Sequence, residues 1–261
     1  MIGAGNMGQA LIKGLLARGL PRYHLYAADA DATIRRAVAR RFRVAVGPKN
    51  LPVVRRAEVV ILAVKPQQLP AVLAQIQAHV TGRHLVISIA AGITLRWLQR
   101  RLPGIPVVRV MPNLPATVGC GFSVLTMGRG VSARQRAIAR ALFKAVGEVV
   151  ELPERQFDAV TAVSGSGPAY VFFLVRLWQE AARTLGLSPA IAATAIGQTL
   201  EGSVRVLRAS GVESGTLIQR VASKGGTTEA ALKVLARRSV SRHFVEAIRA
   251  AAARSRTLSW H

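Results

Sequence analysis

The character of the sequence changes near residue 152. Before this point, short apolar runs rich in β-branched residues alternate with helical patterns, and after Pro153 the strand-like runs disappear. Strands that alternate with helices predict βαβ units around a parallel sheet, whereas long windows of Ala, Leu and Val predict helices. We therefore expect an α/β domain with a doubly wound sheet over residues 1–152, followed by an all-α domain over residues 153–261.

The bounds of the expected elements come from the apolar runs and from capping residues. Ser132 is expected to cap a helix that ends near Gly147, and Gly186 and Gly211 are expected to end two helices of the second domain. The expected strands span residues 24–28, 59–64, 85–90, 107–111, 121–127 and 148–152. The expected helices of the second domain span residues 153–163, 167–186, 189–209, 213–222, 227–237 and 240–256.

Two helical windows of the second domain, residues 169–177 and 191–200, are apolar on nearly every face. A helix that is apolar all round has to be buried. A domain of this size cannot easily bury several such helices by itself. We therefore expect a partner subunit to cover them, which makes the second domain a candidate dimerisation domain.

The composition is that of a globular protein with an unusual charge. Apolar residues make up 51% of the 261 residues and charged residues 18%, which excludes a disordered chain. The 36 basic and 12 acidic side chains give a net charge of +24, which attracts any phosphate-bearing ligand, whether dinucleotide or nucleic acid. Because most of the basic residues are arginines scattered along the chain, the charge alone is weak evidence for a nucleic-acid partner.

The sequence contains one cysteine, Cys120, so no internal disulfide can form. We expect this residue to be a small buried apolar group in a reducing compartment. The longest wholly apolar interior run, residues 169–175, is much shorter than the ~20 residues that cross a bilayer, and the start lacks a basic signal region. These features predict a cytoplasmic protein without a membrane partner.

Residues 3–8 read Gly-Ala-Gly-Asn-Met-Gly and open an apolar-periodic helix. In this G-x-G-x-x-G pattern, Gly3 permits a tight turn, Gly5 lets the backbone approach a pyrophosphate, and Gly8 permits close packing. The helix start adds N–H donors and a positive dipole end. The motif predicts a Rossmann-type site for a dinucleotide. Only two residues precede Gly3, so the first strand is either curtailed or continues upstream of this sequence.

Asp29 follows Gly8 by 21 residues and lies at the end of the next expected strand. A carboxylate at about this offset binds a ribose hydroxyl in dinucleotide-binding folds, which favours NADH. Arg35 and Arg36 follow shortly afterwards and are able to meet a 2′-phosphate, which favours NADPH. The sequence leaves both cofactors open.

Further motifs lie at strand ends and helix starts. Residues 63–66, 88–92 and 111–113 follow expected strands, where open α/β sheets bind their ligands. Residues 164–170 and 223–228 combine Ser, Thr and Gly at helix starts, which suits an anion such as a substrate carboxylate. The five histidines fall in no motif, and no carboxylates are paired, so a metal site and acid/base hydrolysis are disfavoured. No catalytic acid or base is identified.

In order along the chain, these blocks are similar to those of the pyrroline-5-carboxylate reductase family, which catalyses the last step of proline biosynthesis. The resemblance covers nearly the whole chain and implies a homodimer or a ring of dimers that uses NADPH or NADH. It implies dinucleotide contacts at Gly3, Ala4, Gly5, Asn6, Met7, Gly8, Asn50, Ala63, Val64, Lys65, Pro66 and Ala91. It implies contacts with pyrroline-5-carboxylate at Glu154, Thr161, Ser223, Thr227 and Thr228.

Some positions depart from the family pattern. Lys224 stands where the family usually has proline, Leu114 where it usually has threonine, and the stretch around Arg220 is less acidic. Two alternatives therefore stay open. One is an inactive paralogue that binds a nucleotide, nucleic acid or a protein partner. The other is an enzyme like the β-hydroxyacid dehydrogenases, although Val171 stands where that class carries a catalytic lysine.

Overall fold

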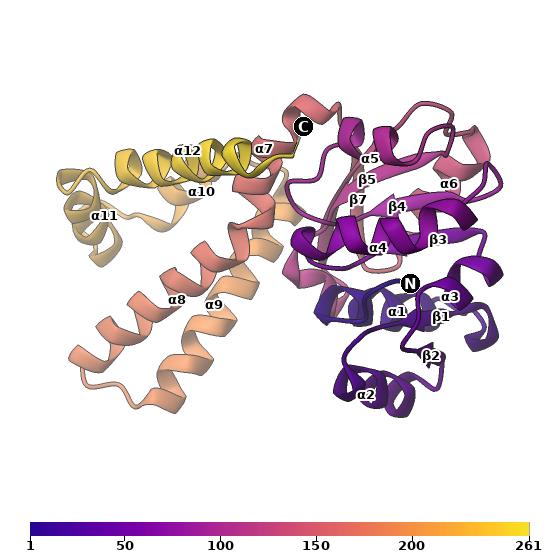
Figure 1. Cartoon of the computed structure of the whole chain (residues 1–261). Helices are drawn as coiled ribbons and strands as arrows, with labels where there is room; N and C mark the ends of the chain where they lie inside the picture. Colours follow the sequence, from indigo (N-terminus) through magenta and orange to yellow (C-terminus); the bar gives the residue numbers. More distant parts are fainter. Residues whose placement is uncertain (261) are drawn as a thin grey trace. The chain divides into compact units, whose positions relative to one another are not determined.

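The computed structural model describes residues 1–260 and divides into two compact units (Figure 1). The first unit contains residues 1–168 together with the C-terminal segment from Ala251, and the second contains Ala169–Ala250. The sequence places a domain boundary at residues 152–153. The structure divides the chain later because residues 154–168 pack within the first unit.

The sheet of the first unit is built around Ile2. This residue forms parallel bridges to Ala28 and to Leu62, and so joins a two-stranded sheet to a five-stranded one. The two-stranded sheet contains β1 (Tyr26–Ala28) and β2 (Ala45–Gly47). The five-stranded sheet contains, in spatial order, β3 (Val59–Leu62), β4 (Leu85–Ser88), β5 (Val107–Met111), β6 (Gly121–Met127) and β7 (Gly147–Glu151).

One strand pair departs from the predicted parallel sheet. β5 and β6 pair antiparallel, whereas all other neighbouring strands pair parallel. A parallel crossover needs a dozen or more residues, and the connection over residues 112–120 is shorter than that, so the chain has to reverse. The expectation of a buried Cys120 was also wrong: the residue is exposed, since it lies in this connection directly after Gly119, which adopts a left-handed conformation.

Helices cover both faces of this sheet and form two separate cores. Leu11 from α1, Val38 from α2 and Phe143 from α6 belong to one core, whereas Val54 from α3 and Leu73 from α4 belong to the other. This two-faced packing confirms the predicted doubly wound fold. The helices are α1 (Asn6–Ala17), α2 (Ala32–Phe42), α3 (Leu51–Arg56), α4 (Leu69–Ile76), α5 (Leu95–Arg101) and α6 (Ala133–Lys144).

Ser132 caps α6 as predicted. Its Oγ accepts a hydrogen bond from the Gln135 N–H at 3.2 Å, and the Gln135 side chain accepts one from the Ser132 N–H at 3.0 Å. We expect Ser132→Ala to lower the free energy of unfolding by about 1 kcal/mol, because the helix start loses an acceptor. Urea denaturation measures this change. Ser132→Asn keeps an acceptor and serves as the control, and equal losses in both variants would contradict the capping role.

The helices from α8 onward match the predicted ranges closely, whereas the predicted helix over residues 153–163 consists of a 3₁₀ turn, the four-residue α7 and the start of a π-helical turn. Gly186 and Gly211 adopt positive φ values of 82° and 62° and end two of them, as predicted. α8 and α9 form an antiparallel hairpin (Figure 1), with Ala182 from α8 buried against Ala192 and Ile196 from α9. The helices are α7 (Phe157–Val160), α8 (Gly167–Thr184), α9 (Pro189–Ser210), α10 (Ser214–Val221), α11 (Thr227–Arg237) and α12 (Val240–Leu258).

The second unit leaves large apolar side chains exposed. Phe172 is 59% exposed, Phe173 52% and Trp178 46%, all on α8. By length and composition alone, the helical stretch Glu154–Thr184 is also apolar enough to cross a membrane, which is weak evidence for a span. Exposed large apolar side chains that gather on one element often mark a protein–protein interface, so this exposure agrees with the expected partner subunit.

The C-terminal segment returns to the first unit, which the sequence pattern did not predict. The Trp260 N–H donates to the Gly92 carbonyl at 2.7 Å, and the Thr94 hydroxyl donates to the Trp260 carbonyl at 2.6 Å. The Trp260 ring meets Trp97 of α5 edge to face at 5.5 Å between centroids. The end of α12 is thereby fixed beside the loop that follows β4.

Candidate active site

The glycine-rich loop, residues 3–8, connects the central Ile2 to α1. Gly3 has a φ of +87°, and a Cβ atom there would lie 2.6 Å from the Ala63 carbonyl oxygen. A Cβ atom on Gly8 would lie 2.6 Å from the Gly3 carbonyl oxygen. The fold itself therefore requires glycine at positions 3 and 8.

Gly5 differs from these two glycines. A Cβ atom at Gly5 would meet nothing within 4 Å, and the residue has a φ of −66°, which alanine adopts easily. No packing in the described chain explains a glycine here. The open space lies at the start of α1, where the backbone of a dinucleotide-binding loop approaches the pyrophosphate.

The start of α1 is suited to an anion. Its N-cap residue is Gly5, no side chain caps it, and its first turn holds no acidic residue. The first N–H groups of a helix have no partner within the helix, and the helix dipole is positive at this end. Ala4, Asn6 and Met7 complete the loop, in which the Gln9 side chain donates to the Ala4 carbonyl at 3.0 Å. Together, these features suit a pyrophosphate group.

The predicted cofactor residues after strands lie along one edge of the sheet. Because β1, β3 and β4 run parallel, Asp29, Ala63 and Ala91, which follow them, lie at their common carboxyl edge. Asp29 is half-buried and Ala91 is exposed. The glycine-rich loop lies at the same edge, since Ile2 pairs in parallel with both Ala28 and Leu62.

The segment after β3 belongs to this edge. Val64 and Pro66 are half-buried, whereas Lys65 is exposed and forms none of the ion pairs found among residues 1–260. Asn50, at the start of α3, is half-buried and donates to the Gln75 side chain at 2.9 Å. The Lys65 ammonium therefore lies exposed on the segment whose Ala63 carbonyl packs against Gly3.

Two motifs that are distant in sequence meet in the first unit. The Asn113 amide donates to Ser164 Oγ at 3.0 Å, and its oxygen accepts from the Phe122 N–H at 2.8 Å. Ser164 belongs to a π-helical turn, Thr161–Gly165, in which the Ser166 N–H reaches back to the Thr161 carbonyl at 2.8 Å. Such turns are frequent at functional sites. Thr161 is half-buried there.

Glu154 has partners within the protein. Its Oε1 accepts from the Leu95 N–H at 2.7 Å and from the Arg109 guanidinium at 2.8 Å. The Arg109 side chain is only 7% exposed, and it also lies over the Phe157 ring at 4.5 Å. Glu154 lines a cavity of about 420 Å³ beside this pair. The carboxylate therefore neutralises a buried cation, a role that the sequence did not predict.

Three predicted substrate residues lie in the second unit, at the start of α11. Ser223 and Thr227 are exposed, and Thr228 is half-buried. Gly226 is the N-cap residue and has no capping side chain. The Glu229 carboxylate accepts from the Gly225 N–H at 2.6 Å, and this bond, with a second from Lys233, lowers the pKa of Glu229. The N–H groups of Thr227 and Thr228, in the first turn, have no acceptor within the helix.

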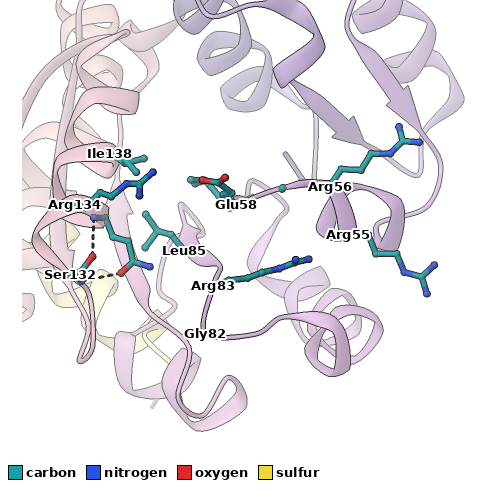
Figure 2. A pocket seen from close by; sticks show the side chains of 12 residues that line it. Arg55, Arg56, Glu58, Gly82, Arg83, Leu85, Ser132, Arg134 and Ile138 are labelled. Atoms are coloured by element: carbon teal, nitrogen blue, oxygen red, sulfur yellow. Dashed lines mark hydrogen bonds between the residues drawn. The ribbon is translucent and has the colours of Figure 1, made fainter.

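Another cavity lies elsewhere in the first unit. Its volume is about 600 Å³, and Arg55, Arg56, Arg83, Arg134 and Glu58 are among its lining residues (Figure 2). Because Glu58 directly precedes β3 and Arg83 lies shortly before β4, this cavity opens at the amino ends of these strands. It is thus at the opposite edge from the glycine-rich loop and is not the dinucleotide site. No group of three or more metal-binding side chains exists within residues 1–260.

Family models match both parts of the chain. A model described as pyrroline-5-carboxylate reductase dimerisation matches residues 154–258, and one described as NADP oxidoreductase, coenzyme F420-dependent, matches residues 1–92. The pyrroline-5-carboxylate reductase of Pseudomonas aeruginosa is 42% identical and aligns over 99% of this chain and 95% of its own length. The enzyme of the same name from Synechocystis is 38% identical, over 99% and 97% of the two chains.

Solved structures agree with these matches. A pyrroline-5-carboxylate reductase from Coxiella burnetii has a TM-score of 0.91 and 34% identity, and the match covers 100% of this chain and 97% of that chain. The Plasmodium falciparum pyrroline carboxylate reductase, solved with NADP bound, has a TM-score of 0.91 at 26% identity, over 99% and 97%. A 3-hydroxyisobutyrate dehydrogenase from Mycobacterium tuberculosis shares only the fold, with 17% identity and a TM-score of 0.51. The chain belongs to the pyrroline-5-carboxylate reductase family.

Proposed function

We propose that this chain reduces pyrroline-5-carboxylate to proline with NADPH or NADH. The observation that carries the proposal is the glycine-rich loop, in which Gly5 leaves open space at the uncapped start of α1. This loop suits a dinucleotide pyrophosphate, and the identity of 42% to a named reductase over nearly the whole chain supports the substrate.

Residues 3–8 would hold the pyrophosphate, and Asn50, Ala91 and residues 63–66 would contact the rest of the dinucleotide. The reduced nicotinamide, when bound, supplies the hydride. We place its ring against the strand ends at residues 90–92 and 111–113. The small, exposed side chain of Ala91 leaves room there for a flat ring.

The substrate needs orientation more than acid or base catalysis. A cyclic imine takes its proton from water before it binds, and the iminium then accepts hydride at carbon, which gives a secondary amine. The N–H groups and hydroxyls of Thr227 and Thr228, with Ser223, would hold the substrate carboxylate. Thr161 would hydrogen-bond the ring nitrogen. A direct contact between Glu154 and the substrate stays a prediction. The bond from Arg109 to the Glu154 carboxylate supports a role in holding the Arg109 side chain in position.

A homodimer would complete the active enzyme. The dimerisation model covers residues 154–258, where Phe172, Phe173 and Trp178 are exposed. We propose that a second copy of the chain covers this apolar surface, that dimers associate further into a ring, and that the enzyme works in the cytoplasm. Light scattering of the purified chain measures the assembly, and a stable monomer would contradict the dimer.

Thr228→Leu should raise the KM for pyrroline-5-carboxylate by about tenfold or more, because a bulky apolar group displaces the carboxylate from the helix start. The dissociation constant of the coenzyme should stay unchanged, since Thr228 has no part in holding it. Steady-state kinetics and coenzyme fluorescence measure the two quantities. Thr184→Leu, at an exposed position near the end of α8, is the control. An unchanged KM in Thr228→Leu would remove Thr228 from the substrate site.

The proposed reaction has a direct test. Oxidation of NADPH or NADH by the purified chain should depend on pyrroline-5-carboxylate, and the chain should restore growth of a proline auxotroph without added proline. Lys224, which is exposed beside the substrate helix, makes this test necessary, because a cation here affects both a carboxylate and an iminium. A folded chain that lacks this oxidation and fails to rescue growth would contradict the proposal.

A further inference from the structure

We propose that this enzyme selects NADH over NADPH through the carboxylates of Asp29 and Asp31. Asp29 follows β1 directly, at the carboxyl edge of the sheet that also holds the glycine-rich loop, and Asp31 follows two residues later as the N-cap of α2. The inference rests on the proposed function, since it requires a dinucleotide to bind at residues 3–8. It concerns the ribose of the adenosine half, which carries a 2′-hydroxyl in NADH and a 2′-phosphate in NADPH.

The Asp29 carboxylate is fixed to the glycine-rich loop itself. Its Oδ2 accepts from the Ala4 N–H at 2.8 Å, and its Oδ1 accepts from the Asp31 N–H at 2.9 Å. Each oxygen keeps acceptor capacity for one further donor. A dinucleotide whose pyrophosphate lies on this loop would therefore meet a carboxylate in a set position. Ribose hydroxyls can donate to it, whereas a 2′-phosphate would be repelled.

Asp31 removes the nearest alternative site for a 2′-phosphate. Its Oδ1 accepts from the N–H groups of Thr33 at 2.6 Å and Ile34 at 3.3 Å, so it caps the start of α2. These N–H groups would otherwise be free to bind an anion. The two bonds lower the pKa of Asp31, with Thr33 as the larger cause, so the carboxylate is ionised at neutral pH.

Of the two neighbouring arginines, Arg35 is engaged by the turn itself. Arg35 uses one guanidinium nitrogen, Nη1, to donate to the carbonyl oxygens of Asp29 at 2.9 Å and Ala30 at 2.7 Å. It thereby holds the turn that presents Asp29. Arg36 lies one residue further along α2, with its Nη2 3.5 Å from the Thr33 hydroxyl. The Asp29 and Asp31 carboxylates thus already accept from the backbone N–H groups next to the proposed ribose site. Arg35 is held by its bonds to the turn.

Binding measurements without substrate test this selection. We expect the dissociation constant of NADPH to exceed that of NADH by about tenfold or more in fluorescence titrations of the intact chain. Asp29→Asn keeps the size of the side chain and removes its charge, and Asp31→Asn keeps a good helix cap. The ratio of the two dissociation constants should fall by about tenfold in the double variant. A general loss of order in the loop would weaken the binding of both coenzymes, so it would leave the ratio of the two dissociation constants unchanged.

Glu58→Gln is the matched control, because Glu58 is exposed and lies at the amino end of β3, on the opposite edge of the sheet. The ratio of the NADPH and NADH dissociation constants in this variant should equal that of the unmodified chain. Equal affinity for both coenzymes, tighter binding of NADPH, or a ratio that the double variant leaves unchanged would overturn the inference alone. If the folded chain binds neither coenzyme, the proposed function fails as well.

Discussion

Gly5→Ala should weaken coenzyme binding by about a hundredfold while leaving the melting temperature of the free protein unchanged. The described chain does not need glycine at this position, since the added methyl group meets nothing within 4 Å and the φ of −66° suits alanine. The methyl group would instead enter the space proposed for the pyrophosphate. Coenzyme fluorescence and differential scanning calorimetry measure the two effects.

Two other glycines serve as controls for this variant. Gly8→Ala should lower the melting temperature, because its Cβ would lie 2.6 Å from the Gly3 carbonyl oxygen. Gly82→Ala should change neither quantity, because a Cβ atom there also meets nothing within 4 Å and the position lies away from the loop. Normal coenzyme affinity in Gly5→Ala would show that the pyrophosphate does not approach this residue.

Glu154→Ala should lower the free energy of unfolding by about 3 kcal/mol. The substitution leaves the Arg109 guanidinium, which is 7% exposed, without its 2.8 Å carboxylate partner, and leaves the Leu95 N–H without an acceptor. This loss is at the lower end of the roughly 3–5 kcal/mol that breaking a buried ion pair costs, because the Glu154 side chain is 32% exposed and water reaches part of the site. Urea denaturation measures the loss.

Glu201→Ala is the control for this loss, since Glu201 pairs with Arg205 on an exposed helix surface and its removal should cost less than about 1 kcal/mol. The same pair of variants separates the two roles of Glu154. A structural role predicts lost stability in Glu154→Ala. Unchanged stability together with a raised KM for pyrroline-5-carboxylate would instead favour the direct substrate contact implied by the family resemblance.

Most of the fold was predictable from local patterns. The strand over residues 121–127 has the predicted bounds, and two helices of the second unit were found because Gly186 and Gly211 mark their ends. β2 was missed since it spans only three residues, none of them buried. The antiparallel pairing of β6 was missed because an apolar run indicates a strand and not its direction.

Contacts between distant residues were not predictable in the same way. Trp260 packs against Trp97, and Arg109 pairs with Glu154 across 45 residues, and neither partner carries a local signal of the other. The π-helical turn at Thr161–Gly165 is likewise hidden within a helical pattern. Residues 154–168 continue that helical pattern, so the sequence assigned them to the second domain although they pack in the first unit.

The candidate site depends both on local sequence patterns and on contacts between distant residues. The spacing of Gly3, Gly5 and Gly8 predicted the loop, and the structure separates the two glycines that the fold requires from the one that leaves space for a ligand. Asp29 was predicted as a ribose ligand from its distance to the motif. Its bond to the Ala4 N–H was not predictable, because it depends on how the loop folds back over the end of β1.

Titration of the purified chain with a reduced coenzyme, followed by nicotinamide fluorescence, tests the role of the glycine-rich loop most directly. The account predicts saturable binding by the unmodified chain and a saturation concentration about a hundredfold higher for Gly5→Ala. The absence of saturable binding by the folded unmodified chain, or identical curves for the two proteins, would contradict it.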